Sequence, residues 1–275
     1  MREIVSTAWL NQNLSKPNLI ILDASLKASA EGKAFEKFNK TIPNARIFDL
    51  KNVFVNKTSP FPNTIPEPEI FETACRQLGI NQDSEIVVFD NNGIFSSPRV
   101  WWLFTVMGHD NIAVLNGGLP NWIKKGFRTE NKHIQTFNAG NFKANFNKSL
   151  FIDFEHVLSN IKEQKFTLID ARSESRFNGI AQEPRKHLKS GNIENSINIP
   201  YQEVLKDGKY KSKSELYALF DEKVKDENEL VFSCGSGMTA CIVLLACQIG
   251  YKSFLKLYDG SWTEWAERNK LLNDV

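Results

Sequence analysis

The chain has 275 residues, more than one compact domain usually holds, so we expect two domains of about 130 residues each. Its 34 Lys and Arg against 32 Asp and Glu leave a net charge of only +2, which gives no electrostatic footprint for nucleic acid or a membrane surface. No apolar run reaches the ~18 residues of a membrane span, and the first residues lack the apolar core of a signal peptide. We therefore expect a soluble, cytoplasmic protein without a nucleic-acid or membrane partner.

The cysteines are too few for a disulfide scaffold in a chain of this length, and none forms a CxxC pair with metal-ligand spacing. They are Cys75, Cys234, Cys241 and Cys247. The sequence predicts reduced thiols, no metal site and no cofactor.

The first half alternates helix-like and strand-like runs. A helix-like stretch follows Ser6, and an apolar strand-like run ends at Asp23. Alternating apolar residues return at 41–50 and 84–93, and a helix-ending glycine, a short strand and a glycine turn follow in 106–122. This switching of period predicts α/β units around a mostly parallel sheet.

The second half repeats this order. The same 147-residue offset separates Ser6 from Asp153 and Asp23 from Asp170. Three later segments of the second half, at 192–201, 228–237 and 248–265, have the same pattern as 41–50, 84–93 and 106–122 of the first half. Four ordered correspondences predict a duplicated domain, since a chance echo would not keep the order along the chain.

Continuous apolar runs mark the strands of the second half. They are TLID (167–170), LVFS (230–233) and FLKLY (254–258). Runs of this length are typical of strands buried on both faces of a parallel sheet. The segment 131–149 has no sustained period and is rich in Asn and Lys, so we interpret it as the linker. We place the two domains at 1–140 and 141–275.

Cys234 stands between the run LVFS and the helix-like segment TACIVLLACQIG. In a parallel α/β sheet this is the carboxyl end of a strand, where such folds build their sites, and it adjoins a helix N-terminus that favours an anion. Gly235 and Gly237 allow the backbone amides to turn inward, and Ser236 and Thr239 add hydroxyl donors. The pattern predicts a cradle of donors around a nucleophilic thiolate.

Other interpretations of these residues are weaker. An inert buried thiol is the alternative for Cys234, and it is the interpretation we favour for the other three cysteines. A phosphate-binding loop would need a Lys after its last glycine, and none follows Gly237. A cysteine phosphatase would need an Arg six positions after its nucleophile, where Ala240 stands.

Several segments resemble the tandem-domain rhodanese family, and the resemblance covers essentially the whole chain. They are CGSGMTAC (234–241), RFNGIAQEPR (176–185), YDGSWTEW (258–265) and, in the first half, SSPRVWWLF (96–104). The resemblance implies an α/β fold of two tandem rhodanese-like domains, each a parallel five-stranded sheet flanked by helices. It also implies that the active site belongs to the second half.

The resemblance further implies a sulfurtransferase. Cys234 would take sulfur from a small-molecule donor, hold it as a persulfide and pass it to a thiol acceptor such as thioredoxin, to a small thiol or to cyanide. Ser236 and Thr239 would relay or orient the proton needed as the donor's carbon fragment leaves. Asp90 occupies the place of the cysteine in the first half, so that half is expected to be catalytically silent.

Arg176 and Arg185 match the two arginines that hold the carboxylate and keto group of 3-mercaptopyruvate in the family. A guanidinium suits this role because it binds a carboxylate with two parallel hydrogen bonds and keeps its charge. The other residues expected to contact the substrate belong to the cysteine loop: Gly235, Gly237 and Met238.

We expect 3-mercaptopyruvate to be the donor, although the sequence carries features of two branches of the family. The thiosulfate-using branch resembles CRKGVT, with basic residues beside the cysteine, whereas Gly235 and Ser236 favour a less charged ketoacid. The mercaptopyruvate-using branch, however, usually carries an Asp and a His where Lys51 and Asn63 stand here. The alternatives are a thiosulfate:cyanide sulfurtransferase and a partner-fed persulfide carrier with little turnover of its own.

Overall fold

The computed structural model describes residues 3–29, 32–224, 228–252 and 255–273. The chain divides into two compact units, and each is described by itself. The first unit consists of Met1–Lys57, Ile65–Asn147 and Asp207–Tyr210, and the second of Thr58–Thr64, Lys148–Lys206 and Lys211–Val275. A short segment from the first half of the sequence, Thr58–Thr64, therefore belongs to the second unit.

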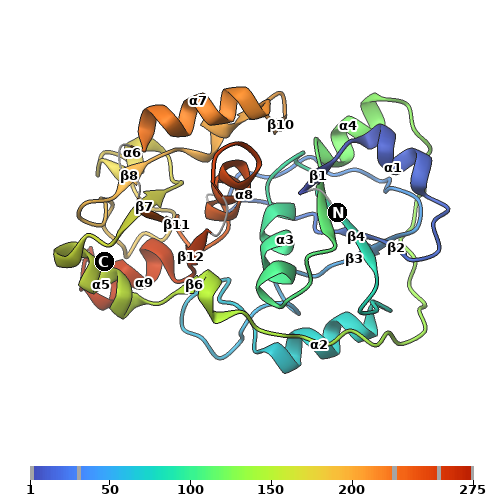
Figure 1. Cartoon of the computed structure of the whole chain (residues 1–275), viewed down its shortest axis with the longest axis horizontal. Coiled ribbons are helices and arrows are strands. Elements are labelled where there is room, and N and C mark those ends of the chain that lie inside the picture. Colours follow the sequence, from blue (N-terminus) through green and yellow to red (C-terminus); the bar gives the residue numbers. More distant parts are fainter. Residues whose placement is uncertain (1–2, 30–31, 225–227, 253–254, 274–275) are drawn as a thin grey trace. The chain divides into compact units, whose positions relative to one another are not determined.

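The first unit contains a five-stranded sheet in the order β1-β5-β4-β2-β3, with every neighbouring pair parallel (Figure 1). The strands of this unit are β1 (Ile4–Val5), β2 (Leu19–Asp23), β3 (Ala45–Ile47), β4 (Glu85–Phe89), β5 (Ile112–Leu115) and the short β10 (Lys209–Tyr210). Its helices are α1 (Thr7–Asn13), α2 (Pro68–Gln77), α3 (Ser97–Val106) and α4 (Gly118–Lys124).

Both faces of this sheet are covered, which explains why β2 and β4 are apolar at every position except Asp23 and Glu85. Alternate residues such as Ile21 and Val87 share a core with Leu10 of α1 and Trp122 of α4. The opposite face carries α3, which packs on β4 and β5, and a cluster of phenylalanines. The phenylalanines in mutual contact are Phe48, Phe54, Phe71, Phe104 and Phe142.

The second unit repeats the arrangement with the order β6-β12-β11-β7-β8, again with parallel pairs throughout. The strands of this unit are β6 (Phe151–Ile152), β7 (Phe166–Asp170), β8 (Ile197–Asn198), β9 (Leu205–Lys206), β11 (Glu229–Ser233) and β12 (Lys256–Tyr258). Its helices are α5 (Phe154–Glu163), α6 (Glu174–Phe177), α7 (Lys213–Lys223), α8 (Ala240–Gly250) and α9 (Ser261–Arg268), with 3-10 turns at η1 (Lys148–Leu150) and η2 (Tyr201–Val204).

Two helical layers enclose the second sheet (Figure 1). On one face, Val157 of α5 and Trp265 of α9 pack with Leu168 and Val231 of the central strands. On the other face, α8 packs between the sheet and α7. The residues of α8 are almost all buried, so this helix is apolar around most of its circumference rather than along one stripe.

The structure confirms the predicted fold, with two five-stranded parallel sheets flanked by helices. The runs TLID and LVFS form β7 and β11, which pair over five residues in the same register as β2 and β4 of the first unit. The predicted strand 254–258 begins at Lys256, and Phe254 lies outside the described residues. The division into silent and catalytic domains at 140/141 stays a prediction.

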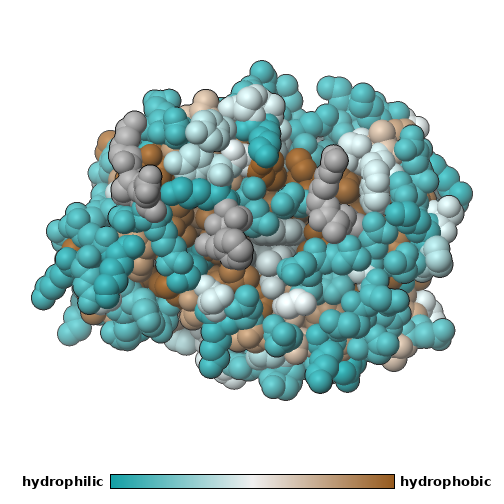
Figure 2. Space-filling view, in the orientation of Figure 1, coloured by the Kyte–Doolittle hydropathy of each residue, from teal (hydrophilic) through white to brown (hydrophobic). Residues whose placement is uncertain are grey.

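The face of the molecule drawn in Figure 2 is mainly hydrophilic. This agrees with a composition in which 24% of residues are charged. Within the described ranges, no helix has both the length and the apolar content needed to cross a bilayer.

Candidate active site

Cys234 follows the last residue of β11, at the carboxyl edge of the second sheet. β11 lies between β7 and β12, so the cysteine is placed centrally at that edge. Its exposed fraction is 1%, and its carbonyl accepts a hydrogen bond from the Trp262 amide at 2.9 Å. This is the position predicted for it, at the switch from a strand to a helix.

The loop after Cys234 curls as its glycines allow. Gly237 has a φ of +76°, in the left-handed region that favours glycine, and α8 begins three residues later. In the described part of the chain, the backbone amides of Ser236, Thr239 and Ala240 have no hydrogen-bond acceptor. These amides precede or begin a helix, so they form a ready receptor for an anion. The neighbouring Met238 is buried, with 6% exposed.

The equivalent loop of the first unit shows such an anion in place. Asp90 corresponds to Cys234, and the same 144-residue offset relates Gly93 to Gly237. The Asp90 carboxylate is fully buried and accepts hydrogen bonds of 2.6–3.1 Å from its own loop. The donors are the amides of Asn92, Phe95, Ser96 and Ser97 and the hydroxyl of Ser97. The loop conformation can therefore hold a negative charge on the side chain at its first position.

Asn63 reaches the cysteine loop from the segment Thr58–Thr64 of the same unit. Its Nδ2 donates to the Ser236 carbonyl at 3.0 Å and to Ser236 Oγ at 2.9 Å. A carbonyl oxygen only accepts, so this contact fixes which end of the Asn63 amide faces Ser236. The Ser236 hydroxyl accepts from Asn63 and keeps its own proton for another partner.

Arg176 belongs to a buried network of four charges. Glu183 accepts from Arg176 through both carboxylate oxygens, at 2.6 and 3.1 Å, and from Arg172 at 2.8 Å. Arg172 also binds both oxygens of Asp170, and its side chain is fully buried against Trp262. Burial alone lowers the pKa of Arg172, but the charges and hydrogen bonds of the two carboxylates outweigh it and raise that pKa. Two cations and two anions make this network neutral overall.

The two predicted arginines flank Cys234 in different ways. The Arg176 guanidinium lies over Gly235, where a Cβ would come within 2.9 Å of Nη2. The Arg185 side chain makes no hydrogen bond or ion pair with the described residues. Burial lowers its pKa, partly offset by the charges of Glu183 and of Cys234. An arginine with a lowered pKa still carries its charge at neutral pH, so Arg185 supplies a net positive charge beside the thiol.

The other cysteines fit the packing role that we favoured. Cys75, Cys241 and Cys247 are all fully buried. Burial raises the pKa of Cys75 and raises that of Cys247 to about 12, so both thiols stay protonated. Cys241 donates its thiol hydrogen to the Gly237 carbonyl, with the sulfur 3.3 Å from the oxygen.

Sequence reasoning missed residues that hold the cysteine loop from a distance. Thr263 donates to the Gly235 carbonyl through its amide, at 3.1 Å, and through its hydroxyl, at 2.6 Å. Ser261 Oγ accepts from the amides of Cys234 and Gly237. A glycine turn followed by Trp occurs in both halves of the sequence, and this repeat could have drawn attention to Ser261 and Thr263. Nothing local in the sequence indicated the role of Glu183.

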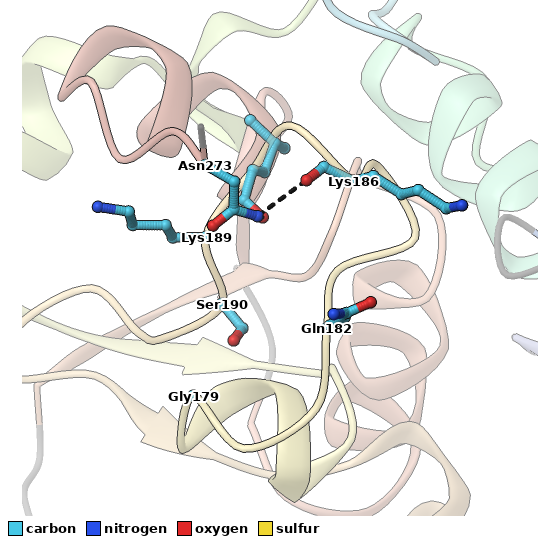
Figure 3. A pocket seen from close by; sticks show the side chains of 7 residues that line it. Gly179, Gln182, Lys186, Lys189, Ser190 and Asn273 are labelled. Atoms are coloured by element: carbon cyan, nitrogen blue, oxygen red, sulfur yellow. Dashed lines mark hydrogen bonds between the residues drawn. The ribbon is translucent and has the colours of Figure 1, made fainter. Parts of the chain in front are cut away.

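The second unit also has a cavity of about 740 Å³ that is not lined by the cysteine loop (Figure 3). Its lining consists of Gly179, Gln182, Lys186, Leu188, Lys189, Ser190 and Asn273. In Figure 3 the side chains of Lys186 and Lys189 extend in opposite directions, so the two ammonium groups do not converge on one point. The predicted substrate residues are not part of this lining. Among the described residues, no cluster of His, Cys, Asp and Glu is arranged to hold a metal ion.

Comparison with known proteins decides the family. The model of the rhodanese-like domain matches twice, at residues 6–125 and 153–268. The chain belongs to the rhodanese-like family. The two matches fall on the two structural repeats, so each sheet with its helices is one rhodanese-like domain.

The rhodanese-like relatives are sulfurtransferases. The 3-mercaptopyruvate sulfurtransferase of Escherichia coli (strain K12) is 36% identical over 97% of this chain and 96% of that protein. The thiosulfate sulfurtransferase of Rattus norvegicus is 38% identical over 97% of this chain and 93% of that protein. The crystal structure of SseA from Escherichia coli, a 3-mercaptopyruvate sulfotransferase, superposes with a TM-score of 0.84 at 33% identity, covering 95% of this chain and 99% of that one. The chain is therefore an enzyme of the sulfurtransferase class.

Proposed function

We propose that the enzyme takes sulfur from 3-mercaptopyruvate, holds it as a persulfide on Cys234 and passes it to a thiol acceptor. The observation that carries this proposal is the pair of equivalent loops. In the first unit the loop surrounds a buried carboxylate with hydrogen-bond donors. In the second unit the same loop begins with a cysteine, and its Ser236, Thr239 and Ala240 amides are available to a sulfur anion.

The proposed reaction has two balanced steps. The Cys234 thiolate attacks the sulfur of 3-mercaptopyruvate, an S–S bond forms, and the C–S bond breaks with its electron pair leaving on carbon. The resulting pyruvate enolate takes up one proton and leaves as pyruvate. The thiolate of an acceptor then attacks the outer sulfur, which leaves Cys234 as a thiolate again. The loop amides stabilise the negative sulfur before and after each step.

The charges around Cys234 favour a donor with a single carboxylate. The network of Arg176, Arg172, Glu183 and Asp170 is neutral, whereas Arg185 adds one net positive charge. The loop amides are the partners of the Cys234 thiolate, so one carboxylate matches the charge of Arg185, while a dianion such as thiosulfate would bring a second charge without a partner. Arg185 would bind the carboxylate directly, and Arg176, held by Glu183, would orient the keto group.

Ser236 is suited to the proton transfer at the leaving carbon. Because Asn63 donates to its oxygen, the Ser236 hydroxyl proton is directed to a different acceptor. Asn63 itself cannot take up a proton at neutral pH. The proton would therefore pass through Ser236 from solvent or substrate, with Thr239 beside it at the start of α8. Thioredoxin, a small thiol or cyanide would accept the sulfur.

The test is a steady-state comparison of 3-mercaptopyruvate and thiosulfate in wild type, Arg185→Ala and Arg176→Ala. We expect Arg185→Ala to raise the KM for 3-mercaptopyruvate at least tenfold, because a charge-assisted hydrogen bond contributes about 1.5–3 kcal/mol. Arg128→Ala is the control, since Arg128 is an exposed arginine of the first unit. Wild-type mercaptopyruvate kinetics in both variants, or a higher kcat/KM with thiosulfate in wild type, would overturn the donor assignment.

A further inference from the structure

The hydroxyl of Ser261 ties the cysteine loop to the end of the neighbouring strand. Ser261 is the first residue of α9 and is fully buried. Its Oγ accepts from the amide of Cys234 at 3.2 Å and from that of Gly237 at 3.1 Å, and it donates to the Tyr258 carbonyl at 2.9 Å. Both acceptor positions and the one proton of the hydroxyl are thus used. One side chain fixes the loop at its first and fourth residues.

A serine at this position is unusual because of its backbone. Ser261 has a φ of +52°, in the left-handed region where a side chain is disfavoured. The equivalent residue of the first unit, Gly118, has the same φ of +52°. The equivalence is supported by hydrogen bonds, since the next amide in each unit donates to the first residue of the loop: Leu119 to Asp90 at 3.0 Å and Trp262 to Cys234 at 2.9 Å. If the turn were the only requirement at this position, glycine would be the favoured residue.

The loop of the first unit needs no such hydroxyl. It is held from within by the Asp90 carboxylate, which accepts from several loop amides at once. A Cβ at Gly118 would lie 2.4 Å from the Asp90 carbonyl oxygen, so no side chain fits there. The two loops thus share one conformation but are anchored in different ways.

We propose that Ser261 is a positioning residue that holds the sulfur cradle independently of what Cys234 carries. This rests on the proposed function, in which Cys234 alternates between a thiol or thiolate and a longer persulfide. The Asp90 carboxylate is always present to organise its loop, whereas the occupant of the second loop changes twice in each cycle. Ser261 fixes the loop from outside, so the amides of Ser236, Thr239 and Ala240 stay aligned for the incoming sulfur.

Ser261→Gly and Ser261→Ala test this role, with Ser233→Ala as the matched control. Gly relieves the disfavoured φ, and both variants remove the hydroxyl. The Ser233 hydroxyl is buried one residue before Cys234 and has no hydrogen-bond partner among the described residues. We expect kcat to fall about tenfold or more in both Ser261 variants, because both lose the hydrogen bonds to the amides of Cys234 and Gly237. The donor KM should change less than about twofold. Ser233→Ala should keep the wild-type kcat.

Hydrogen–deuterium exchange of the peptide covering 234–240 supplies a readout that a merely structural role would not move. In both Ser261 variants we expect faster exchange in the sulfur-free form and recovery of protection on loading with sulfur, because the persulfide anion then anchors the loop from within. Wild type should exchange equally slowly in both forms.

Three results would overturn the inference: wild-type kcat in both Ser261 variants, a loss in Ser261→Ala that Ser261→Gly restores, or an equal loss in Ser233→Ala. If wild type gains no sulfur from any donor, the proposed function fails instead. Exchange in the sulfur-free form alone then decides whether Ser261 anchors the loop, and unchanged protection in both variants would reject it.

Discussion

At the scale of single residues, the space beside Cys234 is set by Gly235. Its backbone does not lie in the left-handed region, so no turn requires glycine there. What requires it is the Arg176 guanidinium, which Glu183 holds in place through two hydrogen bonds. The absence of a side chain at this position thus allows an arginine from a distant segment to approach the cysteine loop.

Gly235→Ala should therefore act through Arg176. The new Cβ would meet Nη2 at 2.9 Å, and the ion pair with Glu183 resists its displacement. We expect the KM for 3-mercaptopyruvate to rise roughly threefold to tenfold, equivalent to about 1 kcal/mol, with little change in the free energy of unfolding. The measurement is a double-mutant cycle with Arg176→Ala, in which the effect of Gly235→Ala should largely disappear. An undiminished effect in the Arg176→Ala background would mean that the alanine acts on the loop itself.

At the scale of elements, the sequence was most informative where burial imposes a pattern. Strands such as β7 and β11 are covered on both faces, so they appear as continuous apolar runs. Because the sequence is duplicated, the elements predicted in one half could be compared with those predicted in the other. Contacts between distant segments have no such pattern. Asn63 lies 173 residues from Ser236 in sequence, and the hydroxyl of Ser261 acts on amides 24 and 27 residues away. The position of Cys234 at the end of a central strand was therefore predictable, its chemistry stays a prediction, and the residues that hold its loop were not predicted.

His109, between α3 and β5, is a buried polar side chain in the core of the first unit. Its exposed fraction is 3%, it packs against Phe104 and Phe142, and its Nε2 lies 3.1 Å from the Ser84 carbonyl. The carbonyl can only accept, so Nε2 carries the hydrogen. Burial lowers the pKa of His109, with smaller opposing contributions from Ser84, Asp110 and Asn111.

This lowered pKa predicts a loss of stability in mild acid. As the pH falls below about 6.5, the unfolded chain binds a proton at this histidine before the folded chain does, so the free energy of unfolding decreases until the folded pKa is passed. The measurement is urea unfolding between about pH 5 and 8 for wild type and His109→Gln, which keeps an N–H donor but does not titrate. The stability of wild type relative to the variant should fall with decreasing pH. A difference that is independent of pH would exclude His109 as the cause.

At the scale of the whole molecule, the two rhodanese-like domains carry different residues, Asp90 and Cys234, at the first position of the same loop. Both place a loop and a helix N-terminus after the central strand of a five-stranded parallel sheet. One copy fills the loop with the Asp90 carboxylate, and the other begins it with Cys234 beside Arg185, whose side chain has no ion pair with the described residues. The first loop keeps its carboxylate, while the second, under the proposed function, would receive and release an anion. We therefore predict a single sulfur site per chain.

The most direct test is the mass of the intact protein after incubation with 3-mercaptopyruvate and, separately, with thiosulfate, followed by removal of the donor. We predict that wild type gains one sulfur atom per chain from 3-mercaptopyruvate and loses it on addition of an acceptor thiol, while Cys234→Ser gains none. A gain only when a partner protein supplies the sulfur would favour the carrier alternative. A gain of sulfur by Cys234→Ser, or no gain by wild type with any donor, would contradict a persulfide on Cys234.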